Sequence, residues 1–408
     1  MNRDIRNIYV KPFFALLLSS ICKILPLAVC MCVALAGTVK GHAQLRQVPF
    51  ESLIKLYDTV NIVFIGDVMQ HGYQIRSAHI PGQNPLKPSS YDYSHAFKYM
   101  KGRFAKADLA VANMEFPVGI TPYSGYPHFS APQSIVEEAI KSGIGLFQIA
   151  NNHIADKGRR GIEQTLNIYD SLGVHYTGVY RNDSTELADS PKIVDIKGIR
   201  IAFINFTYGT NGMPVPSPFI VNTMDSTKVK ESIKRAKQRG AQIIVALPHW
   251  GEEYMLLPSG QQKKWANMLF RNGVRIIIGT HPHVPQSAEI YLSKTDHPRK
   301  YGEVEKIVFY SLGNYISNQS SPDYTQLGMA VEIKIVKNNL NGEIALSKPY
   351  FEYLWCFKKG EFAPDYTVIP VKELLKKEDS VRNKEQYSRM KNTYNFIMRK
   401  NTVKTILK

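Results

Sequence analysis

The sequence predicts an α/β fold with one large hydrophobic core. Between Val60 and Leu312, short β-branched apolar runs alternate with amphipathic helical patterns, as in layered α/β architectures. The chain has 408 residues, of which 44% are hydrophobic and 21% are charged, so it does not have the composition of a disordered protein. Several apolar runs are followed at once by metal-binding residue types, which is where open α/β sheets build their sites.

The N-terminus has the pattern of a secretory signal peptide. A basic stretch that ends at Lys11 precedes an apolar stretch, and small residues lie at a candidate cleavage point after Ala43. Lys23 interrupts the apolar stretch, so an uncleaved membrane anchor is the alternative. We expect residues 1–43 to be a signal peptide or an N-terminal membrane anchor, and the protein to be exported to the periplasm or cell envelope.

Histidines, carboxylates and an amide follow the apolar runs. His281 and His283 come shortly after the run 274–278, and a pair of imidazoles in a turn after a buried strand can converge on a metal. Residues of ligand type also follow the other runs, namely Asp67, Glu115, Asn152, His153 and His249. This recurrence predicts a metal site at the ends of the strands.

Amphipathic helices are predicted between the apolar runs. In 158–171 and 226–239 the apolar positions recur at helical spacing, so each helix packs one face on a sheet. Another helix begins with a capping box formed by Ser259 and Gln262 and ends at Gly273. Later strands are predicted at 306–310, 329–336 and 343–346, the last two joined by a hairpin turn.

The C-terminal region is basic. The formal net charge of +17 is concentrated in part after Val371, and residues 357–408 are predicted to be a basic, helical C-terminal extension. Such a charged segment is either a solvated helix or a patch for an anionic polymer or lipid headgroups. The predicted leader argues against a nucleic acid partner.

The motifs of the central region resemble a known family. In chain order they are Gly66-Asp67-Val68-Met69, Asn113-Met114-Glu115, Asn151-Asn152-His153, Pro248-His249-Trp250-Gly251, Gly279-Thr280-His281-Pro282-His283 and Ser311-Leu312-Gly313-Asn314. Together they resemble the capsule-synthesis CapA family, a branch similar to the calcineurin-like metallophosphoesterases. The resemblance implies a four-layer αββα sandwich of the metallophosphoesterase type over residues 58–356. It also implies association with poly-γ-glutamate or a related capsule polymer.

The resemblance further implies a site for two divalent metal ions, Mn, Fe or Zn. It assigns Asp67 and His283 to one ion, Asn152, His249 and His281 to the other, and Glu115 to the bridging position, where such enzymes commonly carry Asp. Metallophosphoesterases usually carry a histidine two residues after the first aspartate, where this chain has Met69. We therefore expect the first ion to be held weakly. His71 is a candidate replacement ligand, with a surface or supporting role as the alternative.

Catalytic and substrate-binding residues are predicted beside these ligands. His153 would face the leaving group of the substrate, and Asp156 would orient it. Asp156 is alternatively a helix N-cap ahead of the helix that begins at 158. We expect substrate contacts from Asn151, Gln286 and Asn314. The alternative is ordinary loop hydrogen bonding. We expect Trp250 and Tyr254 to line a carbohydrate or polymer groove. The alternative is that they pack in the core.

The sequence supports two functions. The first is a metal-dependent phosphoesterase or hydrolase of the cell envelope in capsule or poly-γ-glutamate synthesis, with metal-activated water as nucleophile. The alternative is a non-catalytic, polymer-binding component of capsule synthesis or export with a degenerate metal site, which Met69 and Glu115 favour. The expected partners are an anionic capsule polymer or its precursor, envelope polymer-synthesis proteins and the membrane surface.

Overall fold

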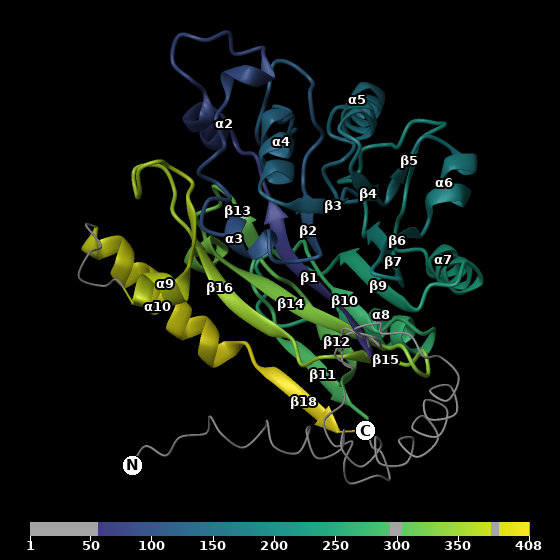
Figure 1. Ribbon diagram of the computed structural model, residues 1–408. Helices are drawn as coiled ribbons and strands as arrows, with labels where there is room; N and C mark the ends of the chain where they lie inside the picture. The colour runs from purple at the N-terminus through teal and green to yellow at the C-terminus, as the bar shows by residue number, and fades with distance from the viewer. Residues whose placement is uncertain (1–55, 294–303, 377–382, 408) are drawn as a thin grey trace, which may run out of the picture. The chain divides into compact units, whose positions relative to one another are not determined.

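The computed structural model describes residues 56–293, 304–376 and 383–407 (Figure 1). The predicted leader, residues 1–43, lies outside the described residues. Within the described ranges, no helix combines the length and the apolar composition that are needed to cross a membrane.

A large mixed sheet forms the centre of the fold (Figure 1). Its main path runs, in order, through β4 (His175–Thr177), β3 (Ile144–Gln148), β2 (Leu109–Met114), β1 (Tyr57–Val68), β14 (Leu327–Asn338), β15 (Ile344–Leu346), β12 (Val304–Phe309), β10 (Ile276–Ile278), β9 (Ile243–His249), β7 (Ile199–Thr207) and β6 (Lys192–Ile196). Strands β1 to β4 are parallel to one another, and so are β12, β10, β9 and β7. The short strand β15 pairs with both β14 and β12 and thereby joins the two halves of the sheet.

Side strands and a small separate sheet complete the β-structure. They are β13 (Asn314–Ile316) beside β1, β16 (Tyr350–Cys356) and β17 (Val368–Pro370) beyond β14, β11 (Ala288–Leu292) and β18 (Val403–Leu407) beyond β12, and the pair β5 (Val179–Tyr180) and β8 (Ile220–Val221). In β13, Asn314 lies opposite Asp67 of β1, so the side strand reaches the end of the central strand.

The described residues also form helices of varied length. They are α2 (Gly72–Ala78), α3 (Lys101–Phe104), α4 (Ser134–Lys141), α5 (Gly158–Ser171), α6 (Asp183–Asp189), α7 (Ser226–Gln238), α8 (Gly260–Arg271), α9 (Val371–Leu375) and α10 (Lys384–Lys400), with short 3-10 turns at Pro88–Ser90 and Asp323–Gln326. The predictions of α5, α7 and α8 are confirmed. The capping box of Ser259 and Gln262 is present at α8, and Gly273 has the positive φ (100°) that the end of this helix requires.

The hydrophobic clusters show a four-layer αββα sandwich. In β1, Ile62 and Phe64 belong to the cluster that contains both sheet halves, whereas Val63 and Ile65 pack with the helices α4 and α5. Such alternation places successive side chains on opposite faces of a strand. A third cluster joins α7 and α8 to the other faces of β7, β9 and β10. The predicted fold class is therefore confirmed.

The basic C-terminal segment packs on the same core. Tyr387, Met390 and Ile397 of α10 are buried in the cluster between the sheet halves, and β18 pairs in parallel with β11. Arg389 is paired with Glu361 at 2.6 Å. The basic segment contains the predicted helix, while the predicted domain boundaries stay predictions.

Candidate metal centre

The predicted ligands come from the carboxyl ends of parallel strands. Asp67 is the penultimate residue of β1, Glu115 directly follows β2, and His249 ends β9. His281 follows β10, and Asn152 follows β3. All of these side chains and that of His283 are buried. The structure thus brings the predicted ligands together at the joint edge of the two parallel sets of strands.

Glu115 occupies the shared position among these ligands. Its Oε1 lies 3.5 Å from Nε2 of His249 and 3.6 Å from Nε2 of His283. Glu115 forms one group of potential metal ligands with Asp67 and His283, and another with His249 and His281, each with donor atoms within 4.8 Å of one another. A carboxylate common to two groups is the arrangement that a two-ion site requires.

Both ring nitrogens of His249 have polar neighbours in this centre. Its Nδ1 lies 3.0 Å from Oγ1 of Thr280, whose hydroxyl donates to the carbonyl oxygen of Pro248. Nδ1 also lies 3.4 Å from Nδ2 of Asn113. Nε2 lies 2.7 Å from Oδ1 of Asn152, so two ligand-type atoms meet at this point.

Two buried atoms of the centre lack hydrogen-bond partners among the described residues. They are Nδ1 of His281 and Oε1 of Glu115. Burial, with added repulsion from His249, His283 and His153, lowers the pKa of His281 well below its ordinary value, so its imidazole is neutral. A buried imidazole nitrogen without a partner, beside a buried carboxylate oxygen, is a pair of atoms that a divalent cation would satisfy. The donor set therefore fits a metal ion.

His283 is paired with both carboxylates. Its Nδ1 lies 3.2 Å from Oδ2 of Asp67. Burial by itself raises the pKa of Asp67, but the hydrogen bond and charge of His283 outweigh it and hold this pKa below its ordinary value. Burial lowers the pKa of His283, yet the charges of Glu115 and Asp67 raise it to about 9. A cation that binds here would displace the proton of His283.

The turn that carries both histidines is strained. His281 has a φ of 97° and His283 a φ of 59°, values in the left-handed region that non-glycine residues seldom adopt. Backbone hydrogen bonds hold the turn, from the N–H of Trp250 to the oxygen of Thr280 (3.1 Å) and from the N–H of Tyr254 to the oxygen of Pro282 (2.8 Å). Strain of this kind persists only where surrounding contacts determine the conformation.

Asn113, for which the sequence suggested no role, connects the ligands. Its Nδ2 donates to Oδ1 of Asp67 (2.8 Å) and to Oε2 of Glu115 (3.3 Å). Its Oδ1 accepts from Nδ2 of Asn151, which also donates to the oxygen of Met114 (2.8 Å). The sequence signals were its place in the motif Asn113-Met114-Glu115 and its position at the end of an apolar run. Asn113 orients both carboxylates.

His153 and Asp156 form the anticipated pair. Nδ1 of His153 lies 2.9 Å from Oδ2 of Asp156, and the same oxygen accepts from the N–H of Phe129 (2.8 Å). The rings of Phe129 and His153 meet edge to face at 4.6 Å. The N-cap of α5 is Lys157, so the alternative of Asp156 as N-cap is wrong. A catalytic role for the pair stays a prediction.

The predicted substrate contacts make internal hydrogen bonds. Oε1 of Gln286 accepts from Gln262 (2.9 Å), and its Nε2 donates to the oxygen of Met255 (2.7 Å). Oδ1 of Asn314 lies 3.0 Å from Nδ1 of His283, and its Nδ2 donates to the oxygen of Thr325 (3.0 Å). These contacts are the ordinary loop hydrogen bonds that were the alternative to substrate binding. Substrate contact by Asn151, Gln286 and Asn314 stays a prediction.

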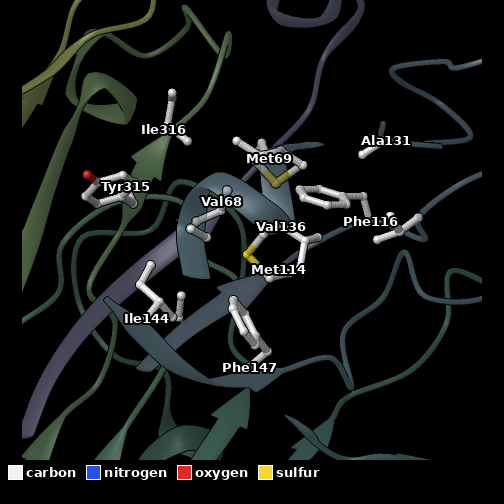
Figure 2. Packing of buried hydrophobic residues seen from close by; sticks show 14 of the residues in the cluster. Val68, Met69, Met114, Phe116, Ala131, Val136, Ile144, Phe147, Tyr315 and Ile316 are labelled. Atoms are coloured by element: carbon white, nitrogen blue, oxygen red, sulfur yellow. The ribbon is translucent and has the colours of Figure 1, made fainter. Parts of the chain in front are cut away.

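Met69 points into the core. It is 1% exposed and packs with Val68, Met114 and Phe116 in the cluster shown in Figure 2. His71 lies beside the centre, where its Nδ1 is 3.0 Å from Oε1 of Gln74. Burial is the main cause that lowers its pKa to about 4. In the described part of the chain, His71 belongs to no group of potential metal ligands among the His, Cys, Asp and Glu residues.

Trp250 belongs to the core. It is fully buried, and its Nε1 donates to the carbonyl oxygen of Tyr310 (2.9 Å). We expect Trp250→Ala to lower the free energy of unfolding by about 3–5 kcal/mol, because it leaves a cavity and removes a hydrogen bond to the carbonyl oxygen of Tyr310. Denaturant unfolding measures this loss. Leu257→Ala, at a side chain that is 64% exposed, serves as control and should change stability by less than about 0.5 kcal/mol. An equal loss of stability in Trp250→Ala and Leu257→Ala would contradict the packing role of Trp250.

Comparisons with known proteins match the chain to proteins of capsule synthesis. The family model of the bacterial capsule synthesis protein PGA_cap matches residues 61–319. The capsule biosynthesis protein CapA of Bacillus anthracis is 28% identical over 275 residues, which cover 64% of this chain and 61% of that protein. The PGA biosynthesis protein CapA of Bacillus subtilis (strain 168) is 26% identical over 287 residues, with 65% and 66% covered. The chain thus spans less than two thirds of the length of these relatives.

Solved structures of similar fold include phosphatases. A novel phosphatase from Mycoplasma pneumoniae has 14% identity and a TM-score of 0.41, with 72% of this chain and 93% of that chain covered. A putative 5′-nucleotidase from Staphylococcus aureus has 14% identity and a TM-score of 0.42, with 82% and 58% covered. Both likenesses are loose, so the assignment rests on the family model, which matches more than half of the chain. The chain belongs to the bacterial capsule synthesis protein PGA_cap family.

Proposed function

We propose that the protein is a metal-dependent hydrolase of capsule synthesis that acts on a phosphoester or amide-like bond of an anionic polymer or its precursor. The observation that carries this proposal is the shared position of Glu115 between two ligand groups. The names of the relatives, which refer to capsule and PGA biosynthesis, support the choice of a capsule polymer such as poly-γ-glutamate.

The residues of the centre would hold two divalent ions. Asp67 and His283 would hold one ion, Asn152, His249 and His281 would hold the other, and Glu115 would contact both. When bound, such ions lower the pKa of water, which supplies the nucleophile, and polarise the oxygen of the scissile group. Asn113 keeps both carboxylates in place through its amide.

His153 would move the proton of the leaving group. Asp156 holds Nδ1 of His153, which leaves Nε2 as the nitrogen that can carry the proton to the leaving oxygen or nitrogen. Phe129 restricts the imidazole by its edge-to-face contact and by its backbone bond to Asp156. The chain thus provides an oriented general acid beside the metal centre.

A phosphodiester assay tests this function. We expect the full-length protein to hydrolyse bis(p-nitrophenyl) phosphate with Mn²⁺ or Zn²⁺, and His153→Ala to lower turnover by about 10²- to 10⁴-fold at unchanged metal content. His175→Ala, at an exposed histidine of β4, is the matched control and should retain turnover. Absence of turnover with either metal, or equal turnover of the wild type and His153→Ala, would count against the proposal.

A non-catalytic, polymer-binding role is the second candidate. It is favoured by the pairing of His283 with Asp67 and Glu115, because a protonated imidazole offsets part of the charge of the two carboxylates without a metal. The basic helix α10 would suit a polyanion. This candidate requires that polymer retention persist after chelation, whereas the hydrolase requires metal for turnover.

We also propose that the protein acts in the periplasm or at the cell envelope, where envelope polymer-synthesis proteins and the membrane surface would be its neighbours. The support is the sequence pattern of residues 1–43. Fractionation of cells that express the full-length chain tests this location, and recovery in the cytoplasm alone would refute it.

A further inference from the structure

The two halves of the metal centre offer unequal numbers of donors. Glu115, His249 and His281 form one group, and Oδ1 of Asn152 adds a fourth donor beside His249. The other group offers Asp67, Glu115 and His283. Zinc takes at least four donors, and manganese and iron usually take more. The group of Asp67 therefore offers one protein donor fewer than the other group and leaves coordination positions for water or a further protein ligand.

Glu253 is a further carboxylate next to this group. Donor atoms of Glu253, His281 and His283 lie within 4.8 Å of one another. Glu253 is exposed, whereas both histidines are buried, so it approaches from the solvent side. Its neighbour Glu252 is also exposed but belongs to no such group in the described part of the chain. Position within the loop, and not acidity alone, distinguishes Glu253.

The loop that carries Glu253 is fixed to the histidine turn. The N–H of Tyr254 donates to the oxygen of Pro282, the residue between the two histidines, at 2.8 Å. The ring of Tyr254 lies 6.3 Å from that of His283, and its hydroxyl accepts from Nε2 of Gln319 (3.3 Å). Glu253 therefore keeps its place relative to His283.

His281 belongs to the Glu253 group as well as to the His249 group, and its buried Nδ1 has no hydrogen-bond partner among the described residues. We propose that Glu253 is an additional ligand of the divalent cation held by Asp67 and His283, contributed from the exposed side of the centre. This inference rests on the proposed metal site. Because Glu253 is exposed and the other ligands are buried, this ion is the more weakly held and more readily exchanged of the two.

Metal titration tests the role of Glu253. The full-length protein, stripped with a chelator, is titrated with Mn²⁺ alone by isothermal calorimetry, and bound metal is counted by elemental analysis. We expect the wild type to bind two ions and Glu253→Gln to keep one, with the affinity for the other lowered at least about 10-fold. Glu252→Gln, the matched control, removes the same charge from the adjacent residue and should bind both ions as the wild type does.

The outcomes separate this inference from the function on which it rests. If Glu253→Gln binds both ions with the affinity of the wild type, or if Glu252→Gln loses as much affinity as Glu253→Gln, the role of Glu253 is overturned. The proposed metal centre would stand in either case. A wild type without affinity for Mn²⁺ would overturn both. Because glutamine has the shape of glutamate and the site is exposed, both variants should unfold like the wild type in the absence of metal.

Discussion

Glu115→Gln is expected to abolish the binding of divalent cations at both ligand groups. Glu115 is the one residue shared by the group of Asp67 and the group of His249, and an amide cannot replace an anionic oxygen between two cations. We expect the affinity for Mn²⁺ to fall by more than about 100-fold. In thermal unfolding, metal at 100 times its Kd stabilises a protein by about 2.7 kcal/mol, and this gain should vanish in the variant.

Asp156→Asn is the control for this experiment. Asp156 is also a buried carboxylate, but it belongs to no group of potential metal ligands in the described residues. The Asp156→Asn variant should therefore bind both ions. Glu115→Gln must still unfold cooperatively without metal, so that the loss is attributed to the centre and not to misfolding. Wild-type affinity in Glu115→Gln would show that Glu115 is not a ligand and would remove the basis of the proposed hydrolase.

Local patterns were sufficient to predict much of the fold. The spacing of apolar residues predicted α5 and α7, and the capping box at Ser259 predicted the start of α8. Both signals are readable because periodicity and caps depend on residues that are close in sequence. The convergence of Asp67, His249 and His283 was also predictable. Parallel strands share one carboxyl edge, so residues that follow them lie close together wherever the strands are adjacent.

Contacts across that edge were not predictable from local patterns. The bonds of Asn113 to both carboxylates depend on β2 lying beside β1, and the position of Glu253 depends on the path of the loop after β9. The sequence did not predict that α10 packs on the core, because basic residues dominate its composition. Its buried residues include Tyr387, Met390 and Ile397. Long-range order of strands and loops has no signature in a short window of sequence.

Gly279→Ala is expected to destabilise the fold strongly. A Cβ at this position would lie 2.0 Å from the carbonyl oxygen of Tyr310 and 2.4 Å from Nε1 of Trp250. The backbone cannot shift to relieve these clashes, because the N–H of Gly279 donates to Phe309 (2.8 Å) and its oxygen accepts from Leu312 (3.1 Å). We expect the free energy of unfolding to fall by more than about 4 kcal/mol, measured by denaturant titration or seen as loss of soluble protein.

Gly260→Ala is the matched control for this prediction. A Cβ at Gly260 meets nothing within 4 Å, and the residue opens α8, where alanine is favoured over glycine by up to about 1 kcal/mol. Because Gly279 stands two residues before His281, any molecules of Gly279→Ala that fold must move the histidine turn and lose affinity for metal. A variant that is as stable as the wild type and binds Mn²⁺ equally well would show that this turn does not fix the metal centre.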